Sequence, residues 1–530
     1  MKAARILIPT LTAAALTLTA CAGDGGGAGS TAAGGGKLAD GKTFTHAITT
    51  DPGNLNPTMT VLSVTRAVGR FLYGRLLEVQ EDGSLVGGLA ERWSGDTTNA
   101  SFTLREGVTC SDGSPLTAKD VAANINFIGD PANKSPLTGL WVEPGTKAVG
   151  DDAARTVTVK SGAPSAFLLH NVGTLSIACG PGLKDPKLLA KGEAGTGMYT
   201  IDEIVPNDHY TLSRRQDFKS GAGDPNQKGL PDKVVFKVIP NETTAVNLLL
   251  SGELNVASVI GPDQERLQAQ KLFHSDLQAP SGQLYFNQAP GRATENEAVR
   301  RALVQALDLG KVGKVLTNGK GTPATSLVTI APNPCRGDNV DGNVPTFDAA
   351  AAKAGFDKAG WLSGADGVRA KDGKKLALTF IYGTAGGPTA TAAAELVQQQ
   401  WKALGVEATL KAVDSTGLNE VLFSTGAWDV SMSPVSISLP SQFVPFISGA
   451  APPKGVNFGH VNNQDYVASV GKATRQAGKA GCADWSAAEV ALFKSVDVVP
   501  FINSTVPYFG KGAEFKADDG VDPASIRMFE

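Results

Sequence analysis

The chain has 530 residues, more than the roughly 250 to 300 that one hydrophobic core usually supports, so at least two lobes are expected. Hydrophobic residues make up 42% and charged residues 19%, a balance typical of a soluble globular protein, which excludes disorder throughout. The chain has 48 Lys and Arg against 51 Asp and Glu. Because it has no excess of positive charge to bind phosphates, we expect no nucleic-acid partner.

The first twenty residues have the pattern of an export signal. Lys2 and Arg5 form a short positive region, and the apolar run Ile6–Ala20 is shorter than the about 20 residues that cross a bilayer as a helix. Leu18-Thr19-Ala20 leads directly into Cys21, which resembles the lipobox of bacterial lipoproteins, where the cysteine is acylated. The alternative is an ordinary leader followed by a buried cysteine. We expect a lipoprotein signal peptide and a lipid anchor on Cys21, at the extracellular face of the cell membrane.

A flexible tether follows the predicted anchor. Residues 22–36 are nearly all Gly, Ala and Ser, a composition that behaves as flexible coil. We therefore expect residues 21–37 to hold the lipidated cysteine and a tether to the folded part.

The spacing from Gly36 to Thr43 also matches a P-loop. A P-loop needs a strand before it and a helix after it, whereas a tether precedes this one, so we interpret the match as chance.

Strands and helices alternate along the rest of the chain without a fixed repeat. Strand-like alternation bounded by Gly, Asp or Pro occurs at Ser101–Leu104, Thr156–Lys160, Val234–Ile239 and Leu376–Ile381. Apolar residues three and four apart predict helices at Ala298–Leu309 and Thr391–Leu404. The pattern predicts an α/β fold.

Motifs of catalysis are absent from the sequence. No serine lies in a Gly-x-Ser-x-Gly elbow, and none of the five histidines begins a His-Glu-x-x-His motif. We expect no enzymatic activity, no cofactor and no metal.

Besides Cys21, the cysteines are Cys110, Cys179, Cys335 and Cys482. Their even number in an exported chain predicts two disulfide bonds, for which three pairings are open.

A series of segments identifies the family that the chain resembles. The segments are, in order, Asp51–Pro57, Phe71–Leu77, Gly88–Trp93, Phe102–Val108, Asp112–Val121, Gly195–Tyr199, Val238–Pro240, Ser251–Ala257, Val299–Leu303 and Trp428–Val430. Together they resemble the extracellular solute-binding proteins of family 5, the oligopeptide, dipeptide and nickel receptors of ABC importers. The resemblance runs from about residue 43 to the C-terminus. The resemblance is strongest at Asp112–Val121. There, Asp112-Gly113 predicts a hairpin-type turn and Thr117 predicts a helix N-cap, so we expect this stretch to have a structural role and not to bind the ligand.

The resemblance implies a two-lobed periplasmic-binding-protein-like fold of type II, in the large peptide-receptor class, with a ligand cleft between the lobes. The large lobe would combine residues 38–281 and 500–530, with an inserted subdomain at about 65–190. The small lobe would hold residues 282–499. Lobe closure around a solute would report occupancy to a membrane partner.

The division into lobes favours one disulfide pairing among the three. Cys110 with Cys179, and Cys335 with Cys482, would each lie within a single lobe.

The function implied by the resemblance is capture of a peptide or other small solute for an ABC permease and ATPase, by a monomer. A ligand-binding sensor or an envelope chaperone without transport is the alternative. By position in the family, the cleft would be lined by Leu62, Ser63, Arg66, Tyr285, Asn287, Thr384, Ser436, Ile437, Ser438 and Phe443.

One departure from the family bears on the ligand. In the peptide receptors, an aspartate after the strand that resembles Trp428–Val430 pairs with the peptide's free amino terminus, whereas Ser431–Leu439 contains no acidic residue here. Burial of an ammonium without a carboxylate costs on the order of several kcal/mol. We therefore expect a ligand without an exposed amine, held by the Ser436 and Ser438 hydroxyls or by backbone groups, with Ile437 and Leu439 on apolar faces. No histidine lies in this loop, which disfavours nickel.

Overall fold

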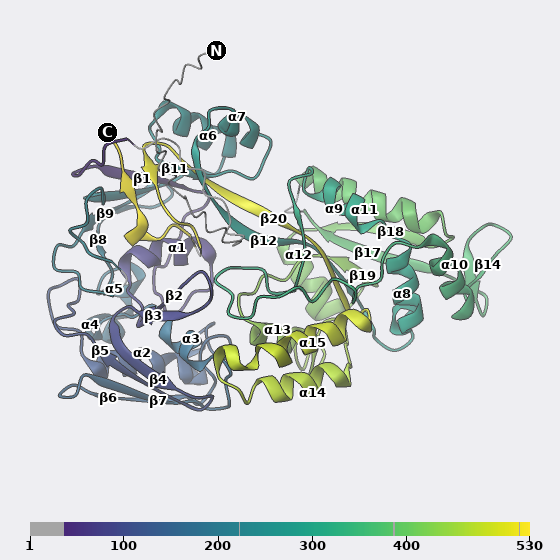
Figure 1. Cartoon of the computed structure of the whole chain (residues 1–530), viewed down its shortest axis with the longest axis horizontal. Helices are drawn as coiled ribbons and strands as arrows, with labels where there is room; N and C mark the ends of the chain where they lie inside the picture. The colour runs from purple at the N-terminus through teal and green to yellow at the C-terminus, as the bar shows by residue number, and fades with distance from the viewer. Residues whose placement is uncertain (1–35, 222, 385–386, 519) are drawn as a thin grey trace, which may run out of the picture.

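The computed structural model describes residues 36–221, 223–384, 387–518 and 520–530. It shows a mixed α/β protein with two lobes (Figure 1). The predicted signal peptide and Cys21 lie outside the described residues. Within the described ranges, no helix has the length and apolar character that a membrane span requires.

One long mixed sheet runs through both lobes. Its strands lie in the order β18 (Glu407–Val413), β17 (Ala377–Gly383), β19 (Val430–Met432), β12 (Phe273–Phe286), β20 (Val498–Gly510), β11 (Val256–Ser258), β1 (Thr43–Ile48), β10 (Lys233–Val238), β9 (His209–Arg214) and β8 (Tyr199–Val205), and β13 (Thr322–Pro323) pairs with β20. We use "large lobe" for the half with β1 and β8–β11, and "small lobe" for the half with β17–β19.

The antiparallel pair β12 and β20 connects the two lobes. β12 has 14 residues, and at about 3.3 Å per residue such a strand is about 45 Å long. It therefore reaches from one lobe into the other, and Figure 1 shows the two strands side by side between the lobes. The predicted chain division, at 281/282 and 499/500, falls within these strands and stays a prediction.

Aromatic packing fixes the first helix of the large lobe. Helix α1 (Ser63–Leu72) carries Phe71, whose ring lies edge-on to the ring of Phe236 on β10, with centroids 5.1 Å apart. The other elements beside this part of the sheet are α6 (Glu242–Ser251), α7 (Gln264–Ala269), β21 (Ala513–Glu514) and β22 (Arg527–Met528).

A smaller antiparallel sheet forms a subdomain of the large lobe. Its strands are β4 (Ala90–Gly95), β5 (Asn99–Leu104), β7 (Thr156–Lys160) and β6 (Lys147–Asp151), and it is accompanied by the hairpin β2 (Leu77–Val79) with β3 (Leu85–Gly87) and by helices α2 (Ala118–Gly129), α3 (Leu168–Gly173), α4 (Gly180–Lys184) and α5 (Pro186–Ala190). The predicted N-cap of α2 is confirmed, because the Asp120 amide donates to Thr117 Oγ1 at 3.0 Å.

The small lobe surrounds β17–β19 with helices. These are α8 (Glu297–Gln305), α9 (Leu309–Leu316), α10 (Ala349–Lys358), α11 (Gly387–Lys402), α12 (Ser415–Glu420), α13 (Pro440–Ile447), α14 (Gln464–Ala473) and α15 (Cys482–Lys494), with a three-stranded sheet of β14 (Leu362–Ser363), β15 (Arg369–Lys371) and β16 (Lys374–Lys375). Trp401 joins three of these elements, since its ring packs on Phe380 and its Nε1 donates to the Leu303 carbonyl at 2.9 Å.

Both predicted disulfide bonds are present. Cys110 is bonded to Cys179, and Cys335 is bonded to Cys482 at the start of α15.

One predicted helix is wrong in its extent. The pattern Ala298–Leu309 predicts a single helix, but α8 ends at Gln305 and α9 begins at Leu309. Asp308 lies between them and accepts a hydrogen bond from the Lys311 amide at 3.0 Å, which starts a new helix. The apolar spacing continues across the break, so periodicity alone does not reveal it.

Candidate binding cleft

Two cavities lie between the lobes. The larger has a volume of about 760 Å³ and the smaller about 340 Å³. Pro434 lines the larger cavity, and Val435–Leu439 line the smaller one. We define residues 434–439 as the cleft loop. Because this loop borders both cavities, they form neighbouring parts of one interlobe cleft.

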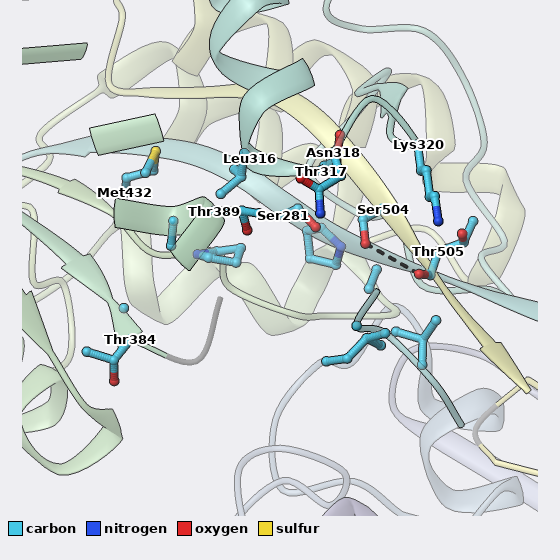
Figure 2. A pocket seen from close by; sticks show the side chains of 18 of the residues that line it. Ser281, Leu316, Thr317, Asn318, Lys320, Thr384, Thr389, Met432, Ser504 and Thr505 are labelled. Atoms are coloured by element: carbon cyan, nitrogen blue, oxygen red, sulfur yellow. Dashed lines mark hydrogen bonds between the residues drawn. The ribbon is translucent and has the colours of Figure 1, made fainter. Parts of the chain in front are cut away.

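The larger cavity lies at the carboxyl ends of the parallel strands of the small lobe. β17 is parallel to both β18 and β19, and the cavity is lined by Thr384 after β17, Asp414 after β18 and Ser433 after β19. Open α/β sheets bind ligands at this edge. The crossing strands form another wall, and Figure 2 shows Ser281 and Ser504 along them.

The larger cavity offers hydroxyl groups beside the charged side chains of Glu265, Lys320 and Asp414. The hydroxyl-bearing residues that line it are Ser281, Thr317, Thr384, Thr389, Ser433, Ser504 and Thr505. Lys320 Nζ donates to Gln264 Oε1 at 3.3 Å, which links the end of α9 to α7 across the lobes. The Asp414 carboxylate caps α12, since its Oδ1 accepts from the Gly417 amide at 2.7 Å.

Two arginines lie in the large-lobe wall of the smaller cavity. Arg66, on α1, places its guanidinium carbon 5.0 Å from the centroid of the Trp141 ring, a cation–π contact. Arg75 follows α1, and its Nη1 lies 3.8 Å from Glu78 Oε2. The described residues that line this cavity include no Asp or Glu. The cationic side chains of this wall are thus both in contact with neighbouring residues of the large lobe.

Helix α3 adds two buried polar side chains to the same wall. His170 Nε2 lies 3.0 Å from the Gly83 carbonyl, which can only accept, so this nitrogen carries the proton. Burial lowers the pKa of His170, so the imidazole is neutral at pH 7. Asn171 is 6% exposed, and its side-chain oxygen has no hydrogen-bond partner among the described residues. A ligand group that donates a hydrogen bond would satisfy it.

The opposite wall, from the small lobe, is apolar with some hydroxyls. It contains Ile330, Ala331, Pro332, the cleft loop from Val435 to Leu439, Gln442 and Phe446. Two glutamines fix the loop: Gln283 Oε1 accepts from the Val435 amide at 2.8 Å, and Gln442 Oε1 accepts from the Leu439 amide at 3.2 Å. The loop is thus held at both ends by side chains.

The residues predicted to line the cleft fall into three groups. Arg66, Ser436, Ile437 and Ser438 line the smaller cavity, and Thr384 lines the larger one. Leu62 and Ser63 are exposed at the start of α1. Tyr285, Asn287 and Phe443 are buried. Ligand contact by all ten stays a prediction.

The three buried residues, Tyr285, Asn287 and Phe443, make hydrogen bonds or ring contacts with other residues of the protein. The Tyr285 hydroxyl donates to Gln283 Oε1 at 2.7 Å, and its ring centroid lies 6.4 Å from that of Phe443. Asn287 Nδ2 donates to the Trp428 carbonyl at 3.0 Å. Tyr285 is thus linked to the cleft loop through Gln283, whose Oε1 also accepts from the Val435 amide.

Sequence reasoning missed Trp141, His170, Asn171 and Lys320. None of them lies in a segment with a family signature or a catalytic spacing, and their neighbours in the cleft come from distant parts of the chain. In the part of the chain that the structure describes, no group of three or more His, Cys, Asp and Glu side chains could hold a metal ion. The cleft offers hydrogen bonds, charged groups of both signs and apolar surface.

Comparisons with known proteins agree with this architecture. The family model of the bacterial extracellular solute-binding proteins, family 5, matches residues 84–451. The glutathione-binding protein GsiB of Salmonella typhimurium (strain LT2) is 26% identical over 386 residues, which cover 71% of this chain and 69% of GsiB.

Solved structures share the fold. The ABC transporter substrate binding protein CtaP of Listeria monocytogenes has a TM-score of 0.78 at 21% identity, over 93% of this chain and 100% of CtaP. The oligopeptide-binding protein AppA of Bacillus subtilis, in complex with a nonapeptide, has a TM-score of 0.69 at 19% identity, over 93% of this chain and 100% of AppA. Since the family model spans most of the chain, this protein belongs to the bacterial extracellular solute-binding proteins of family 5, the substrate-binding components of ABC importers.

Proposed function

We propose that this chain is a lipid-anchored receptor that encloses a small solute between its lobes and delivers it to the permease and ATPase of an ABC importer. The observation that carries the proposal is the pair of cavities on either side of the cleft loop, each bounded by both lobes. The named relative is a binding protein, and we assign no reaction to this chain. It acts as a monomer on the outer face of the membrane, held through Cys21.

Closure of the lobes is supported by contacts across the cleft. Lys479 Nζ of the small lobe donates to Asp82 Oδ2 of the large lobe at 3.3 Å, and the Gly478 amide donates to the Ala166 carbonyl at 2.7 Å. Among the described strands, β12 and β20 are the pair that runs from one half of the long sheet into the other. Bending of this pair would open and close the cleft, and the solute would bind the closed state more tightly.

The solute does not need a free amine. The segment Ser431–Leu439 has no acidic residue, and the smaller cavity beside it has none among its described lining residues. Of the two acidic residues that line the larger cavity, Asp414 caps α12 and Glu265 lies on α7. An ammonium buried in the smaller cavity would therefore lack a carboxylate partner among the described lining residues, which is unfavourable.

Calorimetry of the purified protein against matched free and N-acetylated short peptides tests this proposal. We expect acetylation to leave the Kd unchanged within a factor of about three or to improve it, because no ion pair is lost. Tight binding of the free forms that acetylation abolishes would show that another carboxylate receives the amine, and the proposed ligand class would be wrong.

A further inference from the structure

Two neighbouring side chains on α3 offer hydrogen-bond acceptors to the smaller cavity, and we propose that the solute presents uncharged N–H groups to them. The two residues are His170 and Asn171. This inference rests on the proposed function, because it names the class of solute that the same cleft takes: a neutral compound that carries amide N–H groups. It concerns the hydrogen-bond donors of the solute rather than its lack of a free amine.

The side chain of Asn171 carries the first step. It is 6% exposed, it lines the smaller cavity, and its Oδ1 has no hydrogen-bond partner among the described residues. Buried polar atoms in native proteins are nearly always hydrogen-bonded, and burial of an acceptor without a donor is unfavourable. The oxygen of a carboxamide can only accept. We therefore expect the solute to donate a hydrogen bond to it.

The imidazole of His170 supplies a second, independent acceptor. Its Nε2 carries the proton that is donated to the Gly83 carbonyl, so Nδ1 keeps a lone pair. Burial lowers the pKa of His170, which keeps the ring neutral and this lone pair unprotonated at pH 7. Because His170 lines the same cavity as Asn171, a solute there can donate to both residues.

The donors of the solute should carry no charge. The described residues that line this cavity include no Asp or Glu, so a buried ammonium would lack the carboxylate partner that it needs. A neutral amide N–H costs much less to remove from water when it finds an acceptor. Two acceptors on adjacent residues suit two successive amides of an N-blocked peptide, or a primary amide with its two N–H groups.

The opposite wall defines the rest of the solute. Ile330, Ile437, Leu439 and Phe446 present apolar surface. The cavity volume of about 340 Å³ lies at the lower end of the range for small-molecule sites. The chemistry fits a short N-blocked peptide amide, or another small neutral amide, with apolar side chains.

Calorimetry with amide-to-ester replacements tests the inference on the native protein. Acetyl-Leu-Phe N-methylamide has three amide N–H groups, and in each of three further compounds one amide is replaced by an ester, which keeps the length and removes one N–H. We expect at least one replacement to raise the Kd about 5- to 100-fold, the range for one buried acceptor left without a donor.

The outcomes separate this inference from the proposed function. Equal binding of all four compounds, or no binding of the parent N-methylamide, would overturn the inference. Equal binding would leave the proposed function standing, which fails instead if acetylation abolishes tight binding of the free peptides.

Variants of Asn171 locate the contact. Asn171→Leu removes the acceptor, so at least one ester that binds the native protein weakly should bind this variant as tightly as the parent amide does. Asn171→Asp keeps an oxygen acceptor and should retain the preference for the amide. Asn247→Leu, at an exposed position of α6 that lines neither cavity, is the matched control and should change neither. The melting temperature without ligand reports any misfolding. If Asn171→Leu keeps the native preference for the amide at all three positions, Asn171 accepts no hydrogen bond from the solute and the inference is wrong.

Discussion

The phenyl ring of Phe167 stacks on the indole ring of Trp485, with centroids 6.0 Å apart and ring planes inclined by 29°. Phe167 precedes α3 in the large lobe and Trp485 lies on α15 in the small lobe, so the pair joins the lobes beside the smaller cavity. Arg336 adds a further link, since its guanidinium donates to the Glu81 carbonyl. Contacts of this kind are lost when the lobes separate, so they favour the closed conformation.

Replacement of the indole should therefore shift the protein towards an open conformation. Trp485→Ala removes an aromatic pair worth about 0.5 to 1.5 kcal/mol, which corresponds to a Kd for solute about 2- to 10-fold higher. Small-angle X-ray scattering should show a larger radius of gyration without ligand. Trp485→Phe is the control: it keeps a ring, and Trp485 Nε1 has no hydrogen-bond partner among the described residues to lose. An unchanged radius and Kd in Trp485→Ala would show that the stack does not stabilise closure.

The bond between Cys335 and Cys482 should matter for ligand binding as well as for stability. It joins residues 147 apart in sequence and fixes the segment after Pro332, which lines the smaller cavity. The double serine variant should lose about 2 to 4 kcal/mol in the free energy of unfolding and bind solute more weakly. The double variant of Cys110 and Cys179, which line neither cavity, should lose stability with an unchanged Kd. Equal effects of both pairs on Kd would contradict this distinction.

A buried carboxyl group should make stability depend on pH near neutrality. Glu489, on α15, accepts a hydrogen bond from Asn339 Nδ2 at 2.9 Å, and burial raises its pKa from 4.5 to about 7. Because the pKa is higher in the folded state, the folded protein binds more protons between these values. The stabilisation is complete below about pH 4.5 and is lost as the pH rises through 7.

Denaturant titrations at a series of pH values test this linkage. Relative to Glu489→Gln, the free energy of unfolding of the native protein should fall between about pH 5 and pH 8, by at most about 3 kcal/mol. Glu395→Gln, on an exposed position of α11, is the control and should keep the native pH dependence. If Glu489→Gln shows the same pH profile as the native protein, the carboxyl group does not titrate in this range.

The sequence predicts the fold better than the cleft, for a physical reason. Strand alternation is local, and Thr156–Lys160 is β7 as predicted. The cap at Thr117 is likewise a signal within four residues. Arg66 and Trp141 are distant in the sequence, and the fold of the large lobe brings them into contact. No local periodicity of the sequence links residues so far apart. The cleft residues that were predicted came from family position, so a residue outside the family's signatures, such as Asn171, gave no signal.

The anchor prediction concerns Cys21, which lies outside the described residues. Cys21→Ala removes the thiol that would be acylated, and we expect the protein to move from the membrane fraction to the soluble fraction with an unchanged melting temperature. Fractionation with immunoblotting measures this. A variant that still sediments with membranes would contradict the lipid anchor.

The side chain of Gln283 should control the position of the cleft loop. It is 1% exposed on β12, and its Oε1 accepts from both the Tyr285 hydroxyl at 2.7 Å and the Val435 amide at 2.8 Å. Gln283→Leu would leave the buried Tyr285 hydroxyl without an acceptor, at a cost of about 1 to 3 kcal/mol, and would also remove the acceptor of the partly buried Val435 amide. Gln283→Glu keeps an acceptor in place. We therefore expect the Gln283→Leu variant to have a lower free energy of unfolding and a higher Kd for the solute. The Gln283→Glu variant should bind the solute more nearly as the native protein does.

Hydrogen exchange of the cleft-loop amides tests the role of Gln283 directly. Because the loop borders both cavities, exchange of its amides should rise in the Gln283→Leu variant before the protein unfolds globally. Unchanged exchange with an unchanged Kd would show that Gln442 alone positions the loop.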